Sequence, residues 1–281
     1  MRTNELVFER TYNAPIAKVW KAITDKNQMK EWYFDMPEFK AEKGFEFSFY
    51  GGKDDKKYLH KCTVTEVDPI TKLAYSWSYD GYPGNSIVKF ELTSESKSQT
   101  RLKLTHSGLD SFPKGDPAFA PESFGEGWTY ITGTSLAEFV ETDTIRQNLN
   151  INATAGRIWQ IILNPNNKWA MAFGGGAYAK TNWKEGSEII WTDQSDEVGA
   201  RGLIKTRIDD KKLVMEYFDE ITPAAGELPG EYQESFELIP TENGTVLLKV
   251  SAGPLSKKYI NTHSEMWVAA LRGIQTLAED K

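Results

Sequence analysis

Cysteine and histidine are scarce in this chain of 281 residues, which has Cys62 as its single cysteine and only three histidines. One cysteine excludes a disulfide within the chain, so a reducing compartment is the expectation. A metal site needs clustered histidine, cysteine or carboxylate ligands, whereas His60, His106 and His263 are scattered outside any ligand motif. His60 and Cys62 share one face of a strand, but no third group completes a ligand set or orients a nucleophile. We expect no metal and no catalytic residue.

Long apolar runs and an excess of positive charge are also missing. The start of the chain, Met1–Leu6, has no apolar signal core, and no stretch approaches membrane-spanning length. The net charge of -7 divides into -3 for residues 1–142 and -4 for residues 143–281. A basic footprint for nucleic acid or an anionic membrane is therefore absent from both halves. These absences predict a cytoplasmic protein with no membrane span and no nucleic-acid partner.

Two short polar or glycine-rich stretches have simple interpretations. Gly174-Gly175-Gly176 follows a helical pattern and lacks the lysine and hydroxyl residue of a phosphate-binding loop, so we interpret it as a turn. Asp54-Asp55-Lys56-Lys57 is predicted to lie at a solvated hairpin tip. Neither stretch indicates a cofactor, and we expect none.

One pattern occurs twice in the chain. Residues 14–23 are APIAKVWKAI, and 139 residues later residues 153–162 are ATAGRIWQII. In both, apolar residues recur with the spacing of a short amphipathic helix. This period is too long for a solenoid repeat, so we predict two copies of one domain, residues 1–142 and 143–281. The short connection between them predicts an interface between the two domains.

Both halves also show the same order of expected elements. In the first half a strand over 6–12 precedes short helices ending near residues 25 and 34, and from residue 39 the apolar period changes to 2. Short strands then lead to a last helix expected over 128–140, whose glycines predict an irregular start or middle. A final helix is expected around Trp267 in the second half. Strands in one run with helices at the ends predict an α+β fold.

Specific residues in this order point to a known family. The first helix begins with Ala-Pro-x-x-x-Val-Trp-x-Ala-Ile-Thr, and later matches are Lys72, Leu73, Trp77, Thr100, Leu102, Leu104, Thr105, His106, Gly108, Gly127 and Trp128. These residues resemble the START-like (SRPBCC, helix-grip) superfamily, in the branch homologous to the C-terminal domain of activators of heat-shock protein 90 ATPase. The second half looks like a diverged copy, with Thr154 in place of the proline and Ser251-Ala252-Gly253 in place of His106-Ser107-Gly108.

The resemblance implies that each half is a curved antiparallel sheet wrapped around a long C-terminal helix, with two short helices after the first strand. It also implies a cavity between sheet and helix that takes lipids, sterols, polyketides or other apolar molecules. The expected lining residues are Trp32, Phe47, Tyr75, Trp77, His106, Trp128, Trp191, Tyr217, Phe236 and Trp267. Each aromatic ring can equally fill the core, and His106 can equally be a structural histidine.

Three functions remain open at this point. The first is non-enzymatic binding of a small apolar, amphipathic or lipid-like ligand, supported by the aromatic residues and by the lack of a catalytic motif. The second, implied by the resemblance, is a protein-interaction module that modulates a heat-shock chaperone in the stress response. The third is a cyclase- or hydrolase-like enzyme, which needs a polar group with a shifted pKa inside the cavity.

Overall fold

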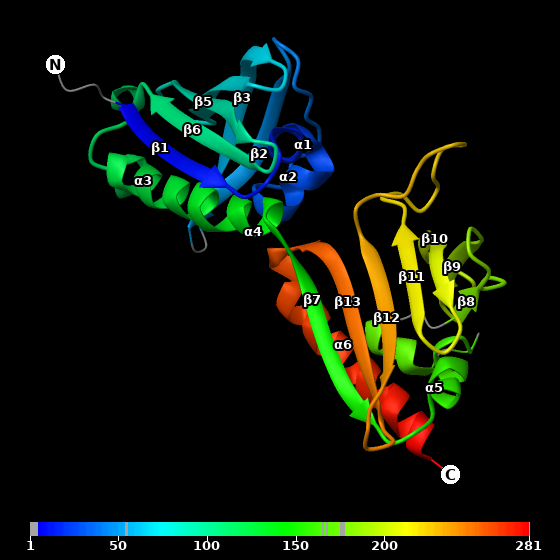
Figure 1. Ribbon diagram of the computed structural model, residues 1–281. Helices are drawn as coiled ribbons and strands as arrows, with labels where there is room; N and C mark the ends of the chain where they lie inside the picture. Colours follow the sequence, from blue (N-terminus) through cyan, green and yellow to red (C-terminus); the bar gives the residue numbers. More distant parts are fainter. Residues whose placement is uncertain (1–4, 54–55, 165, 167, 175–177, 281) are drawn as a thin grey trace. The chain divides into compact units, whose positions relative to one another are not determined.

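The alternating stretches of the sequence form two antiparallel sheets, one in each half of the chain (Figure 1). The structure is a computed structural model that describes residues 5–53, 56–164, 166, 168–174 and 178–280. Asp54 and Asp55 of the predicted hairpin tip and two glycines of the triplet, Gly175 and Gly176, lie outside the described residues, whereas Lys56 and Lys57 begin a strand. The chain divides into unit 1, Met1–Thr142, and unit 2, Asp143–Lys281. Each unit has its own hydrophobic core.

Unit 1 contains a six-stranded sheet in the order β1-β6-β5-β4-β3-β2, counted over the described residues. Two short helices follow the first strand, and a longer helical segment follows the last, as predicted. The elements are β1 (Glu5–Tyr12), α1 (Ile16–Thr24), α2 (Lys26–Trp32), β2 (Glu46–Lys53), β3 (Lys56–Asp68), β4 (Lys72–Tyr79), β5 (Ser86–Ser96), β6 (Gln99–Ser107), the 3₁₀ turns η1 (Leu109–Ser111) and η2 (Pro117–Phe119), α3 (Pro121–Tyr130), the π-turn η3 (Ile131–Ser135) and α4 (Leu136–Val140).

The last helical segment of unit 1 differs from the expectation at its start. Helix α3 begins at Pro121 and not at Trp128, because proline is well suited to the first turn, where a backbone N–H has no helical partner. The expected irregularity is confirmed by η3, which separates α3 from α4 around Gly133. Figure 1 shows α3 and α4 lying along β1 and β6.

Unit 2 repeats this order with a seven-stranded sheet, β7-β13-β12-β11-β10-β9-β8, within the part of the chain that the structure describes. Its second short helix is a 3₁₀ helix, and its last helix begins at Lys257, well before Trp267. The elements are β7 (Thr142–Ile151), α5 (Ala155–Ile162), the 3₁₀ helix η4 (Lys168–Phe173), β8 (Tyr178–Lys180), β9 (Glu188–Thr192), β10 (Val198–Ile208), β11 (Lys212–Tyr217), β12 (Gln233–Pro240), β13 (Val246–Ser256) and α6 (Lys257–Glu279). The predicted α+β class with two tandem helix-grip units is confirmed.

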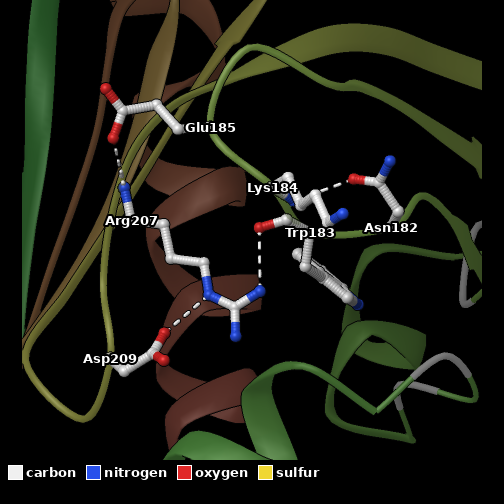
Figure 2. A network of polar contacts seen from close by, with 6 residues as sticks. All are labelled: Asn182, Trp183, Lys184, Glu185, Arg207 and Asp209. Carbon is white, nitrogen blue, oxygen red and sulfur yellow. Dashed lines mark hydrogen bonds and ion pairs between the residues drawn. The ribbon is translucent and has the colours of Figure 1, made fainter.

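A polar network around Arg207 supports the segment before β9 (Figure 2). Trp183 is buried and has a positive φ of 59°, a conformation that costs a non-glycine residue about 1–2 kcal/mol. Arg207 donates from Nη1 to the Trp183 carbonyl at 3.0 Å and from Nε to Asp209 at 2.7 Å. The Arg207 backbone N–H donates to Glu185 at 3.4 Å. We interpret this network as structural support for the turn.

Strand pairing shows which inner positions of the two units correspond. Leu73 lies opposite Phe90 in unit 1, and Leu213 lies opposite Phe236 in unit 2. Two residues before Phe90 or Phe236, the next ladders (β5 with β6, and β12 with β13) place Val88 opposite His106 and Glu234 opposite Ala252. Ala252 therefore corresponds to His106, one residue later than the sequence comparison placed it. At this level of the inner face the polar residue is His106 on β6 in unit 1 and Glu234 on β12 in unit 2.

Candidate functional site

The aromatic residues expected to line a cavity are all buried, and in each unit they lie in one hydrophobic core. In unit 1 the ring centroids of Trp77 and Trp128 are 5.7 Å apart, and those of Phe47 and Tyr75 are 5.3 Å apart. Trp32 is anchored because its indole N–H donates to the Ala22 carbonyl at 2.9 Å. The rings thus fill much of the space among themselves. In unit 2 the expected lining residues Trp191, Tyr217, Phe236 and Trp267 are all buried in the core.

His106 is held in one protonation state by its neighbours. The Trp128 indole N–H donates to His106 Nδ1 at 3.0 Å, so this nitrogen must be an acceptor. In the neutral ring Nε2 then carries the proton and donates to Ser86 Oγ at 2.8 Å, and Ser86 donates to the Trp77 carbonyl at 3.2 Å. Burial lowers the pKa of His106 to about 3. Both ring nitrogens are engaged, which fits the structural interpretation of this histidine.

Burial also shifts the pKa values of other polar groups in the first core. His60 stacks on Phe49 with ring centroids 4.5 Å apart, and burial lowers its pKa to about 4. Burial raises the pKa of the Cys62 thiol, so its nucleophilic thiolate form is disfavoured. The hydroxyls of Tyr33 and Tyr75 lie 3.0 Å apart. Among the described residues no group of three or more His, Cys, Asp or Glu is arranged to hold a metal ion.

A hollow of about 970 Å³ lies at one end of unit 1, lined by Glu5 and Leu6 at the start of β1 and by residues of the 109–121 segment. The side chains of Phe112 and Phe119 belong to this lining and stack with centroids 5.8 Å apart. Tyr79 contacts both rings, at 5.3 Å and 5.0 Å, and contacts Trp77 at 6.3 Å. The floor of the hollow is therefore continuous with the aromatic core. Charged side chains, Asp110, Lys114 and Asp116, also line it.

This hollow was not predicted from the sequence. The expected lining residues lie on strands and helices, whereas the hollow depends on the loop between β6 and α3, which contains η1 and η2. A signal was available, because Phe112 and Phe119 are two aromatic residues in a proline-rich loop.

Unit 2 contains a different polar group on its inner face. Tyr217 donates to Glu234 Oε2 at 2.7 Å, and Tyr232 donates to Glu234 Oε1 at 2.9 Å. The Trp191 indole N–H donates to the Tyr217 hydroxyl at 3.1 Å. Burial raises the pKa of Glu234, while the hydrogen bonds from both tyrosines oppose this rise. Of these four residues, Trp191 and Tyr217 were predicted as site residues, but Glu234 and Tyr232 were missed.

Among the described residues, no helix combines the length and the apolar composition that crossing a bilayer requires. No curated protein matches the chain. Solved structures similar to the chain include BH1534 from Bacillus halodurans, with 28% identity over 49% of this chain and 96% of that chain, at a TM-score of 0.40. Two others each cover 98% of both chains. They are DynU16 from the dynemicin biosynthetic locus, with 18% identity and a TM-score of 0.40, and the di-domain ARO/CYC StfQ from the steffimycin biosynthetic pathway, with 11% identity and a TM-score of 0.39.

The two halves of the chain match one family model separately. The matches cover residues 13–141 and residues 152–279, which is nearly all of both units. The tandem arrangement predicted from the repeated helix start is thus found in the family comparison as well. The chain belongs to the family of Activator of Hsp90 ATPase homolog 1-like proteins, and carries its domain twice.

Proposed function

We propose that unit 1 is a non-enzymatic binding module for a small apolar or amphipathic molecule, which it takes up in the hollow between β1 and the 109–121 segment. The observation that carries this proposal is the volume of the hollow, about 970 Å³. Small-molecule pockets commonly occupy about 300–1,000 Å³ and are lined mainly by apolar and aromatic side chains. The apolar part of the ligand packs on Phe112 and Phe119, and its polar end meets the charged rim.

The predicted lining residues do not line this hollow, but they lie in the same aromatic core as Phe112 and Phe119. Tyr79 connects the floor of the hollow to Trp77, and Trp77 contacts Trp128. A ligand that packs on Phe112 and Phe119 therefore rests on rings that are continuous with the aromatic core. Apolar burial supplies most of the binding free energy in such a site, at about 25 cal/mol per Å².

Nile red fluorescence, followed by competition with fatty acids, sterols and aromatic polyketides, tests the proposal. Ala120 lines the hollow, whereas Ala118 lies outside its lining. Ala120→Phe should weaken probe binding by at least about fivefold because the ring fills the hollow, and the matched control Ala118→Phe should stay within about twofold. Equal binding by the two variants, or the absence of any competitor in the panel, would show that the hollow is not a ligand site.

Modulation of a heat-shock chaperone is the second candidate, and the family description supports it. This function requires a protein partner and no internal ligand. It is tested by measuring the ATPase rate of purified heat-shock protein 90 with increasing amounts of this protein. A saturable change in rate supports the candidate, and an unchanged rate excludes it.

A further inference from the structure

The inner faces of the two units differ in the position and kind of their polar residue. In unit 1, Val88 is fully buried and apolar, and its neighbour His106 has both ring nitrogens engaged. In unit 2 the corresponding residues are Glu234 and Ala252. A carboxyl group thus replaces an isopropyl group at the same level of the sheet. Such a replacement is costly in a core unless the carboxyl group has a hydrogen-bonding or charged partner, because a buried charge loses its hydration.

Glu234 has hydrogen-bond donors but no cation beside it. Its carboxyl oxygens accept from Tyr217 and Tyr232 at 2.7 Å and 2.9 Å, and no described lysine, arginine or histidine forms an ion pair with it. Each oxygen has a second lone pair that a further donor can use. Glu234 and Tyr232 are each partly exposed as whole residues.

Aromatic rings surround this carboxyl group. The rings of Tyr217 and Tyr232 lie 5.6 Å apart, and Trp191 is hydrogen-bonded to the Tyr217 hydroxyl. The Trp169 ring meets the Trp191 ring edge to face at 6.0 Å, and the buried Trp169 indole N–H has no hydrogen-bond partner among the described residues. Aromatic faces attract cations, and a buried N–H without a partner has an unused hydrogen bond that a ligand oxygen can accept.

The sequence around the site has one sign of charge. Residues 213–248 contain eight Asp or Glu residues and no Lys, Arg or His. This segment includes β12, the loop that ends at Tyr232, and all of β11 except Lys212. Lys205 of the neighbouring β10 pairs with one of its carboxylates, Glu216. A surface with one sign of charge raises the local concentration of ligands of the opposite sign.

We propose that unit 2 holds a second binding site, distinct from the hollow of unit 1, in which Glu234, Tyr217 and Tyr232 receive the ammonium group of a small organic cation that also bears an oxygen acceptor. The ammonium N–H groups donate to the free lone pairs of Glu234 and lie against the tyrosine rings. The oxygen of the ligand accepts from the Trp169 indole. The proposal does not depend on the proposed function of unit 1, because its residues come from unit 2 alone.

Calorimetric titration of the full chain with 2-amino-1-phenylethanol, which is cationic at pH 7, tests this site. Its neutral analogue 1-phenyl-1,2-ethanediol keeps the ring and the hydroxyl and lacks the charge. We expect saturable binding of the amine and at least about tenfold weaker binding of the diol, since a charged hydrogen bond contributes more than a neutral one. No saturable binding of the amine, or equal binding of the diol, would overturn the proposal.

Matched variants locate the binding. Glu234→Gln removes the charge and keeps the size of the side chain, and should weaken amine binding by at least about tenfold. Glu237→Gln is the control, because Glu237 is exposed on the opposite face of the same strand, and it should stay within about twofold. Unchanged binding in Glu234→Gln contradicts the site. If that variant fails to fold, the comparison of amine and diol on the unmodified chain still decides.

Discussion

The hydrogen bond between Trp128 and His106 in unit 1 has no counterpart in unit 2. In unit 1 the Trp128 indole donates to His106 at 3.0 Å. In unit 2, Ala252 takes the place of His106, and the buried indole N–H of Trp267 has no partner among the described residues. Leaving a buried donor unpaired costs about 1–3 kcal/mol. The sequence left His106 open as a contact to a ligand. In the structure it belongs to a chain of hydrogen bonds within the core.

The low pKa of His106 makes the stability of the chain sensitive to acid. In the unfolded state this ring binds a proton below its ordinary pKa of 6.5, whereas in the folded state it does so only near 3. Stability from the neutral ring is therefore present above pH 6.5 and is lost as the pH falls toward 3. The free energy of unfolding changes with pH by at most about 1.4 kcal/mol per pH unit through this one group.

Urea unfolding of the wild type and His106→Ala at pH 7, 5.5 and 4.5 measures this effect. The wild type should be more stable at pH 7, and the difference in the free energy of unfolding should shrink as the pH falls. A difference that stays constant across this range would show that His106 does not titrate as the structure implies.

At the scale of elements, the last helix of unit 1 is shaped by one contact with the first strand. The π-turn Ile131–Ser135 disturbs the regular helical hydrogen bonds, as such turns do. The hydroxyl of the fully buried Tyr12 donates to the Thr132 carbonyl at 2.7 Å and supplies a partner there. Glycines in the sequence predicted an irregular helix. They did not show that a tyrosine 120 positions away donates a hydrogen bond to a carbonyl of the irregular turn.

Tyr12→Phe should therefore destabilise unit 1 by about 1–2 kcal/mol, because it leaves a carbonyl without its donor while keeping the ring. Tyr50→Phe is a suitable control, since Tyr50 is 65% exposed. Thermal and urea unfolding measure both variants. If the two variants lose the same free energy of unfolding, the hydrogen bond to Thr132 does not stabilise the turn.

At the scale of the whole molecule, the chain is organised as two separate hydrophobic cores. The buried cluster of unit 1 runs from Tyr12 to Val140, and that of unit 2 runs from Ile145 to Ala278. Each unit has nearly the length of a typical domain, and neither cluster includes residues of the other unit.

Residues 1–142 and 143–281, produced as separate chains, should each unfold cooperatively. Their cores are complete within each segment, so neither segment needs the other to bury its apolar residues. Circular dichroism in the near ultraviolet, followed on heating, measures the loss of tryptophan packing in each. A segment with no cooperative transition would show that its core is not self-sufficient.

The sequence alone determined the fold class, the tandem arrangement and the identity of most buried aromatic residues. These follow from local periodicity, since spacing of apolar residues by 3.6 or 2 specifies which face of an element is buried. Trp77, Trp128, Tyr217 and Trp267 were expected inside the fold from the resemblance to the START-like superfamily, and they are buried.

Only the tertiary structure decided what those residues contact and where a ligand can enter. The partners of Glu234 come from β11 and from the residue just before β12, and the hollow of unit 1 is formed by a loop and the start of β1. Such groupings depend on strand register and loop conformation. Residues far apart in the chain meet there, and no local pattern in the sequence records which of them will be neighbours.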